Sequence, residues 1–294
     1  MHTAGVSVRV HVNGSVCDRD SAVISVFDRG FLYGDSVYEV LRTSGGRPVD
    51  LDRHLERLAR SSAAIELRLP DEAEIRKAVG DTLAAAGNPE SYVRIIVTRG
   101  GGAITLDIAA AERPSLLVIV APLALPPAEL YQRGAHLAVV GVERTSRRAV
   151  DPAVKSGNYL NNIMALAEAR RAGAYEALMC GPDGRVAEGS TSNVFAVRGG
   201  GLVTPALGTG ILPGITRQRV IELAASAGLS TGEGDLYPDD LRGADEVFIT
   251  SSIRGVMPVT RVDDQVISGG SPGPITRRLM DLYARFLSDV AAGA

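Results

Sequence analysis

Stretches in which apolar and polar residues alternate predict the strands of this chain. From Val6 to Val12 every second residue is valine, and Asn13-Gly14 follows as a hairpin turn. Other short apolar or alternating stretches have the length and composition of strands. We expect these further strands at residues 22–27, 37–42, 92–98, 116–120, 136–142, 193–197 and 246–250.

Apolar residues spaced three and four apart predict helices between these strands. Leu51, Leu55 and Leu58 share one face of a helix expected over residues 52–64. A second helix is expected over 71–86, where Asp71 is the N-cap and Gly87-Asn88 ends the helix. The same spacing predicts helices over 160–172, 215–227 and 274–290.

A proline-rich stretch suggests how the chain is divided into domains. Residues 121–133 contain three prolines, which favours a linker. We therefore expect a small domain over 1–121, a linker over 122–133 and a large domain over 134–294. Strands and helices do not alternate strictly, which predicts an α+β fold in both domains.

Composition restricts the class of protein. With 294 residues, 45% hydrophobic and 22% charged, the chain has the composition of a globular protein. A net charge of -3 gives no indication of a nucleic-acid or anionic-membrane partner. Two cysteines and four scattered histidines predict neither a disulfide framework nor a metal site. No targeting segment or membrane span is visible, so we expect a cytoplasmic protein.

The rarity of lysine draws attention to one amine. Of 31 basic residues only Lys77 and Lys155 are lysines. A guanidinium does not lose its proton in water, so a chain rich in arginine would keep lysine where an imine must form. Lys155 lies at the entry to an expected helix, where a cation opposes the helix dipole. It is either a partly buried reactive amine or a solvated lysine.

Other segments have two interpretations each. Glu188 precedes small polar residues, and is either part of a polar turn or an acid that holds a protonated heterocycle. Residues 212–217 begin a helix. Its first turn is either a phosphate-binding site or an ordinary helix start. The hydroxyls of residues 250–252 follow a buried strand. His54 and Arg57 are three residues apart and share one helical face. They are either ligands of a bound group or surface residues.

Taken together, these segments closely resemble the class IV aminotransferases, which depend on pyridoxal 5′-phosphate (PLP) and have fold type IV. This family includes branched-chain aminotransferases, D-amino acid aminotransferases and aminodeoxychorismate lyases. The resemblance covers nearly the whole chain, and the matching blocks occur in the family's order. They are residues 27–42, 52–58, 92–100, 155–160, 188–217 and 244–252.

The resemblance implies a two-domain α+β fold like that of D-amino acid aminotransferase, with PLP in a cleft and a homodimer whose partner loops complete each site. It implies that Lys155 forms a Schiff base with PLP and then moves the proton between the substrate and the cofactor. It also implies that Glu188 keeps the pyridine nitrogen protonated. The other expected cofactor ligands are Tyr159 near O3′, Leu212 on the ring face, and Arg57, Ile215, Thr216 and Ser252 at the phosphate.

The substrate is less closely defined by the resemblance. Tyr92 and Arg94 resemble the Tyr-x-Arg pair of branched-chain enzymes, whereas Tyr38 resembles a tyrosine of D-amino acid enzymes. Ile253 and Arg254 lie in a turn that departs from the branched-chain pattern, and Arg254 is either a substrate ligand or a solvated loop residue. We expect L-branched-chain donors with 2-oxoglutarate as acceptor. The alternatives are a D-amino acid or (R)-amine transaminase, an aminodeoxychorismate lyase and a PLP-binding scaffold without activity.

Overall fold

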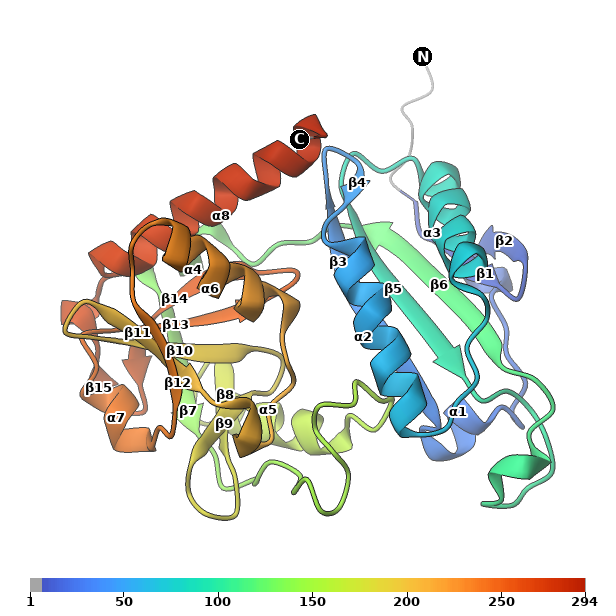
Figure 1. Cartoon of the computed structure of the whole chain (residues 1–294), viewed down its shortest axis with the longest axis horizontal. Helices are drawn as coiled ribbons and strands as arrows, with labels where there is room; N and C mark the ends of the chain where they lie inside the picture. The colour runs from blue at the N-terminus through green and yellow to red at the C-terminus, as the bar shows by residue number, and fades with distance from the viewer. Residues whose placement is uncertain (1–6, 294) are drawn as a thin grey trace. The chain divides into compact units, whose positions relative to one another are not determined.

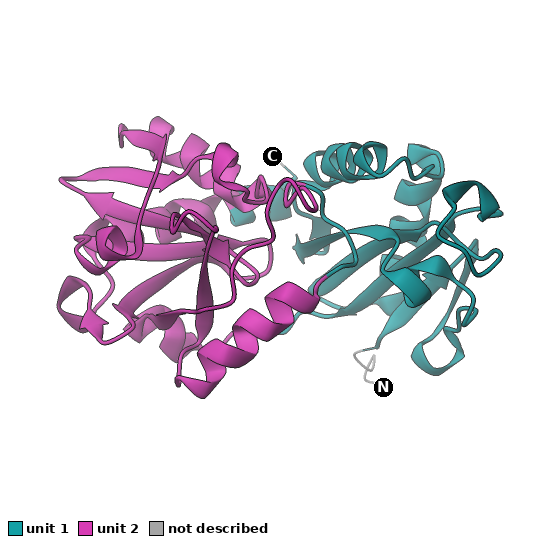
Figure 2. Cartoon of the chain, turned by 90° about the horizontal axis from the view of Figure 1, so that it is seen from below, with its two compact units in different colours: residues 1–124, 154–158, 287–294 teal, residues 125–153, 159–286 magenta. Residues whose placement is uncertain are grey.

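The computed structural model describes residues 7–293, which form two compact units. Unit 1 comprises residues 1–124, Val154–Asn158 and Leu287–Ala294, and unit 2 comprises Leu125–Ala153 and Tyr159–Phe286 (Figure 2). The chain leaves unit 1 within the linker expected at 122–133. Two segments that were expected in the large domain, Val154–Asn158 and the C-terminal residues, belong to unit 1 instead.

Unit 1 is built on a six-stranded antiparallel sheet in the order β2-β1-β6-β5-β3-β4 (Figure 1). The expected hairpin at Asn13-Gly14 joins β1 to β2. Val6, where that strand was expected to begin, lies outside the described residues. The elements are β1 (Arg9–Val12), β2 (Ser15–Asp18), α1 (Arg29–Tyr33), β3 (Ser36–Ser44), β4 (Arg47–Pro48), α2 (Leu51–Ala64), α3 (Glu72–Ala86), β5 (Ser91–Thr98) and β6 (Ser115–Pro122), with the 3₁₀ turns η1 (Arg19–Ser21) and η2 (Ile108–Ala110).

The apolar core of unit 1 lies between one face of this sheet and helices α2 and α3 (Figure 1). Val93, Ile95 and Val97 of β5 point into it and are fully buried. Tyr92 and Arg94, which alternate with them, lie on the other face and are half-buried. The expected alternation of β5 and the apolar face of α2 are therefore confirmed.

Two expectations for the irregular parts of the chain are wrong. Residues 22–27 form no strand, and Val23, Val26 and Phe27 of this segment are exposed. An apolar run becomes a strand only beside another strand, and none pairs with it among the described residues. The proline-rich linker contains a short helix, α4 (Ala128–Arg133), with Pro127 at its N-cap. Proline is tolerated there because the first N–H groups of a helix have no partner within it.

Unit 2 contains a nine-stranded mixed sheet in the order β12-β11-β10-β13-β14-β7-β8-β9, with β15 paired to β14. The strands are β7 (Ala135–Val139), β8 (Glu176–Cys180), β9 (Val186–Gly189), β10 (Asn193–Arg198), β11 (Gly201–Pro205), β12 (Thr231–Gly234), β13 (Glu246–Ser251), β14 (Gly255–Val262) and β15 (Gln265–Val266). The helices are α4, α5 (Leu160–Arg171), α6 (Ile215–Ser226), α7 (Pro238–Arg242) and α8 (Pro274–Ala292), with the 3₁₀ turns η3 (Leu207–Thr209) and η4 (Ser268–Gly270).

The helices expected near residues 160, 215 and 274 are confirmed as α5, α6 and α8. Phe195 and Phe248 stack at the centre of the unit 2 sheet, with ring centroids 4.8 Å apart. β13 is buried along nearly its whole length, which positions the Ser252–Arg254 turn at its end. Within residues 7–293, no helix has the length and apolar character needed to cross a membrane.

Candidate active site

The predicted site residues fall into two groups, and each group lies within one unit. Unit 1 carries Tyr38, Arg57, Tyr92, Arg94 and Lys155. Unit 2 carries Tyr159, Glu188, Leu212, Ile215, Thr216, Ser252, Ile253 and Arg254.

Lys155 lies on the edge of β3 and not at the entry to a helix. Its carbonyl oxygen accepts a hydrogen bond from Tyr38 N at 3.0 Å, and Gly157 N donates to Ser36 O at 2.9 Å. Helix α5 begins only at Leu160. A Cβ on Gly157 would lie 2.3 Å from Ser36 Oγ, so only glycine allows this close approach. The backbone of Lys155 is therefore anchored to the sheet while its side chain is half-buried.

Two cations share the ring of Tyr38. The Lys155 Nζ lies 4.6 Å from the ring centroid, and the Arg94 guanidinium carbon lies 4.1 Å from it. Among residues 7–293 the Arg94 side chain has no hydrogen bond or ion pair. A half-buried guanidinium without an anionic partner, close to a second cation, is suited to bind an anionic group such as a carboxylate.

On the opposite face of β3, Glu39 binds two residues of α2. Its carboxylate accepts from Arg57 Nε at 2.8 Å and Nη2 at 2.7 Å, and lies 2.7 Å from His54 Nδ1. Burial alone would raise the pKa of Glu39, but the charge and hydrogen bonds of Arg57 and His54 lower this pKa to about 2. Burial lowers the pKa of His54 more than Glu39 raises it, so a neutral imidazole donates its Nδ1 hydrogen to the carboxylate.

Glu188 is the centre of the group in unit 2. Arg144 donates to its Oε1 from Nε at 3.0 Å and lies 2.9 Å away through Nη2. Its Oε2 accepts from Leu212 N at 3.0 Å and from Asn193 Nδ2 at 3.2 Å. A carboxylate with charged and neutral donors on both oxygens is held in a fixed orientation as an anion.

The start of helix α6 follows Leu212 by three residues. Gly214 is its N-cap, and no side chain caps the amides of the first turn. A Cβ on Gly214 would lie 1.9 Å from Asn193 Oδ1, which explains the glycine at this close approach. In unit 2 the Thr250 hydroxyl at the end of β13 is also buried, and has no hydrogen-bond partner among the described residues. These groups can receive the oxygens of a bound anion.

The residues of unit 2 fit PLP. An ionised carboxylate suits a protonated pyridine nitrogen, and an uncapped helix start, joined to it by residues 212–214, suits a phosphate at the other end of a small planar ring. When bound, PLP withdraws electrons from the carbon that carries the amino group of a substrate.

Arg254 is not a solvated loop residue, because its side chain binds other residues of unit 2. It is paired with Glu176 at 2.9 Å and donates to Thr191 and Ser251. Sequence reasoning missed the roles of Glu176 and Arg144 and the pair that Glu39 forms with Arg57. A signal for Glu176 existed, because a lone carboxylate within an apolar strand must be paired or hydrogen-bonded.

Comparisons with known proteins identify the family of this chain. Residues 36–262 match the family described as amino-transferase class IV. A Methanocaldococcus jannaschii protein assigned as a branched-chain-amino-acid aminotransferase is 36% identical over 94% of this chain and 95% of its own length. A D-alanine aminotransferase of Bacillus licheniformis is 34% identical over 97% of this chain and 99% of its own length.

A solved structure shares the fold. It is a branched-chain amino acid aminotransferase (T.th.), complexed with N-(5′-phosphopyridoxyl)-L-glutamate, and it matches with a TM-score of 0.89 and 29% identity, over 95% of this chain and 93% of that one. The fold predicted from the sequence is therefore confirmed. The chain belongs to the class IV aminotransferases, and it transfers amino groups with PLP as its cofactor.

Proposed function

We propose that this enzyme moves the amino group of L-branched-chain amino acids to 2-oxoglutarate. In this proposal Lys155 forms the Schiff base with PLP and carries the proton to and from the substrate carbon. Glu188 holds the ring nitrogen in its protonated form. Tyr159 donates near O3′ and Leu212 packs on the ring, while Arg57, Ile215, Thr216 and Ser252 hold the phosphate.

The observation that carries the substrate proposal is the meeting of Arg94 and Lys155 at the ring of Tyr38. Arg94 lies 4.1 Å and the Lys155 amine 4.6 Å from the ring centroid. A donor whose carboxylate binds Arg94 would therefore present its adjacent amine-bearing carbon toward Lys155. Tyr92, two residues away on the same strand face, would give the carboxylate a second donor.

Apolar donors fit the strand face beside Arg94. Ile96 continues this face and lies opposite Tyr38 in the ladder, and the proposed site also includes Ile253. An apolar pocket discriminates by about 1–3 kcal/mol per methylene, so we expect activity toward several aliphatic donors. The L-glutamate part of the ligand in the solved aminotransferase structure supports the handedness and the acceptor that we propose.

Transamination of D-amino acids is the second candidate. It is favoured by the 34% identity to D-alanine aminotransferase and by the position of Tyr38 beside the reactive amine. If the carboxylate binds on the side away from Arg94, the donor is turned around and its mirror image presents the hydrogen to Lys155. An (R)-amine, which has no carboxylate, would react by the same reversed orientation.

The ratio of half-reaction rate constants for L-leucine and D-alanine separates the two candidates. Both donors are mixed with the holoenzyme at equal concentration, and the loss of the PLP absorption band is followed. We expect L-leucine to react faster. A ratio below one would replace the branched-chain proposal by the D-amino acid one.

We further propose that two copies of the chain form a homodimer. Unit 1 exposes several large apolar side chains, among them Phe31, which is 67% exposed, and Leu106, which is 79% exposed. The segments that carry these two residues are joined, because Arg29 donates to Thr105 O and binds Asp35 at 3.1 Å. Exposed apolar clusters of this kind mark interaction sites. The other large apolar side chains that are exposed in residues 23–31 and 104–108 are Val23, Ile24, Val26, Phe27, Ile104 and Ile108.

Sedimentation analysis of the holoenzyme tests this assembly. We expect a dimer, and we expect Leu106→Asp to shift the population to monomers. Val266→Asp, which places the same charge at an exposed valine of β15, serves as the control and should leave the dimer intact. A wild-type monomer at micromolar concentration would contradict the proposal.

A further inference from the structure

The guanidinium of Arg254 is almost fully occupied inside unit 2. Its Nη1 donates to Glu176 Oε2 at 2.9 Å, and its Nε donates to Ser251 Oγ at 3.0 Å. Its Nη2 donates to both the backbone oxygen and the hydroxyl of Thr191. Four of the five N–H groups of this side chain are therefore engaged. One N–H is left for another acceptor, so a two-pronged contact with a substrate carboxylate would require displacement of an existing partner.

Glu176 is the point where this network converges. Its carboxylate is 2% exposed and accepts from Ser190 N at 3.1 Å, Thr191 Oγ1 at 3.0 Å and Ser192 Oγ at 3.4 Å. The Ser190 hydroxyl donates to the same carboxylate. A buried carboxylate is stable only when its oxygens are satisfied in this way, so Glu176 fixes the path of the Ser190–Ser192 loop.

The Ser190–Ser192 loop connects directly to the proposed cofactor ligands. It begins two residues after Glu188 and is followed by Asn193, which donates both to Glu188 and to Leu212 O at 3.0 Å. Arg254 in turn directly follows Ser252 and Ile253 in the turn between β13 and β14. The pair of Arg254 with Glu176 therefore joins two segments, and each carries a residue of the proposed site.

We propose that Arg254 is a positioning residue for the cofactor site and not a ligand of the substrate carboxylate. Its ion pair with Glu176 holds the turn that carries Ser252 and Ile253 against the loop that follows Glu188. This inference rests on the proposed assignment of Glu188 and Ser252 to PLP. Loss of either charge leaves the other buried without its counter-charge, which disturbs both segments at once.

The experiment compares Arg254→Met, Glu176→Gln and the double variant. The dissociation constant of PLP is measured by titration of each apoprotein, and the inhibition constant of 4-methylvalerate, the leucine skeleton without its amino group, is measured on each holoenzyme saturated with PLP. We expect each single substitution to weaken PLP binding about tenfold or more. The double variant should weaken PLP binding by less than the product of the two single-variant factors, because it leaves no uncompensated charge.

Arg254→Lys keeps the positive charge, and it can be tested even if Arg254→Met and Glu176→Gln do not fold. We expect it to bind PLP with an affinity between those of the wild type and Arg254→Met. Arg261→Met is the matched control, because Arg261 lies on β14 with its guanidinium exposed and should leave PLP affinity unchanged.

A direct role for Arg254 in substrate binding predicts a different pattern. Substitution of Arg254, by lysine or methionine, would then raise the inhibition constant of 4-methylvalerate without changing PLP affinity, while Glu176→Gln would change neither. That result would overturn the inference. The substrate proposal fails separately, because a preference for D-alanine in the wild type leaves the PLP titrations unaffected.

Discussion

Glu39 and Arg57 form a two-pronged ion pair inside unit 1, with Nε and Nη2 of the arginine at 2.8 and 2.7 Å from the two carboxylate oxygens. Neither side chain is accessible to solvent to any useful extent. The pair joins β3 to α2 on the face of the strand opposite to Tyr38. Arg57, which we propose as a phosphate ligand, is thus held in place by Glu39.

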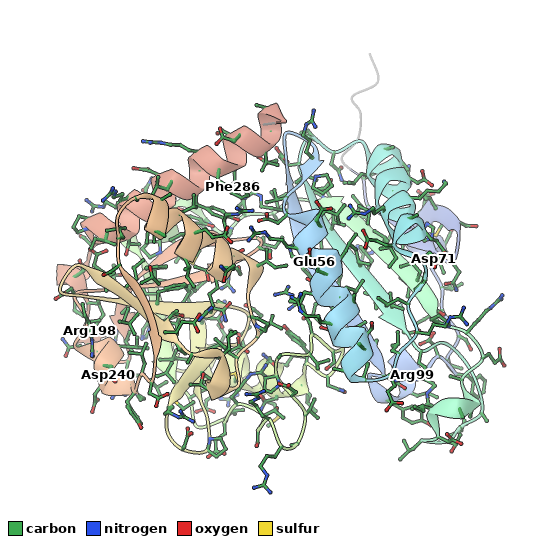
Figure 3. The ribbon with its side chains drawn as sticks, in the orientation of Figure 1. Glu56, Asp71, Arg99, Arg198, Asp240 and Phe286 are labelled. Carbon is green, nitrogen blue, oxygen red and sulfur yellow. The ribbon has the colours of Figure 1, made fainter. Side chains whose placement is uncertain are left out.

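Replacing Glu39 by Gln is expected to destabilise the protein by about 3 kcal/mol, because the Arg57 charge is left buried without compensation. Chemical denaturation of the two proteins at neutral pH measures the difference. Glu56→Gln makes the same change on an exposed residue of α2 and is the control (Figure 3). Equal stability of Glu39→Gln and wild type would contradict this role of the pair.

The same pair predicts how stability depends on pH. The pKa of Glu39 falls from its ordinary value of 4.5 to about 2 on folding, so its contribution is complete above pH 4.5 and is lost as pH falls toward 2. The wild type should therefore lose stability more steeply over this acidic range than Glu39→Gln. Denaturation midpoints measured at a series of pH values test this, and parallel pH profiles would refute it.

Lys155→Ala is expected to abolish transamination while PLP still binds weakly, because the phosphate and ring contacts remain. Lys77→Ala is an internal control, since Lys77 is the only other lysine and lies exposed on α3. Borohydride reduction of the wild-type holoenzyme, followed by peptide mass spectrometry, should find the cofactor on Lys155 alone. Normal turnover by Lys155→Ala would remove this residue from the mechanism.

Glu188→Gln should slow the half-reaction with L-leucine by about two orders of magnitude, since a neutral amide does not keep the pyridine nitrogen protonated. Stopped-flow absorbance of the holoenzyme gives the rate constant. Glu168→Gln, at a residue of α5 that accepts from Gly141 N, provides a control substitution in unit 2. An unchanged rate in Glu188→Gln would show that this carboxylate only shapes the turn.

Arg94→Gln is expected to raise the KM for L-leucine and for 2-oxoglutarate by about tenfold or more, with PLP affinity preserved, because a charge-assisted hydrogen bond to the carboxylate is lost. Steady-state kinetics at saturating PLP measure this change. The exposed Arg60 of α2, changed to Gln, is the control. Loss of PLP in Arg94→Gln would instead make the arginine part of the cofactor site.

Much of the secondary structure could be predicted from the sequence, because periodicity is a local property. The alternation in β5 and the apolar face of α2 follow from residues close in the chain. Helices α2 and α3 end near the residues at which their ends were expected. Residues 22–27 show the limit of this reasoning. Their apolar pattern is compatible with a strand, but a strand also needs a neighbour, and unit 1 leaves this segment exposed.

The sequence by itself determined the family. It also singled out Lys155, which is one of two lysines, and Glu188, which belongs to a distinctive block. Only the tertiary structure decided which charges neutralise one another. Glu176 and Arg254 are separated by 78 positions, and they meet because β8 and the turn after β13 lie in one folded unit. An arginine without a buried carboxylate beside it stays available for a ligand, as Arg94 does. Whether a charge is available depends on which distant residues pack against it, and local sequence does not contain that information.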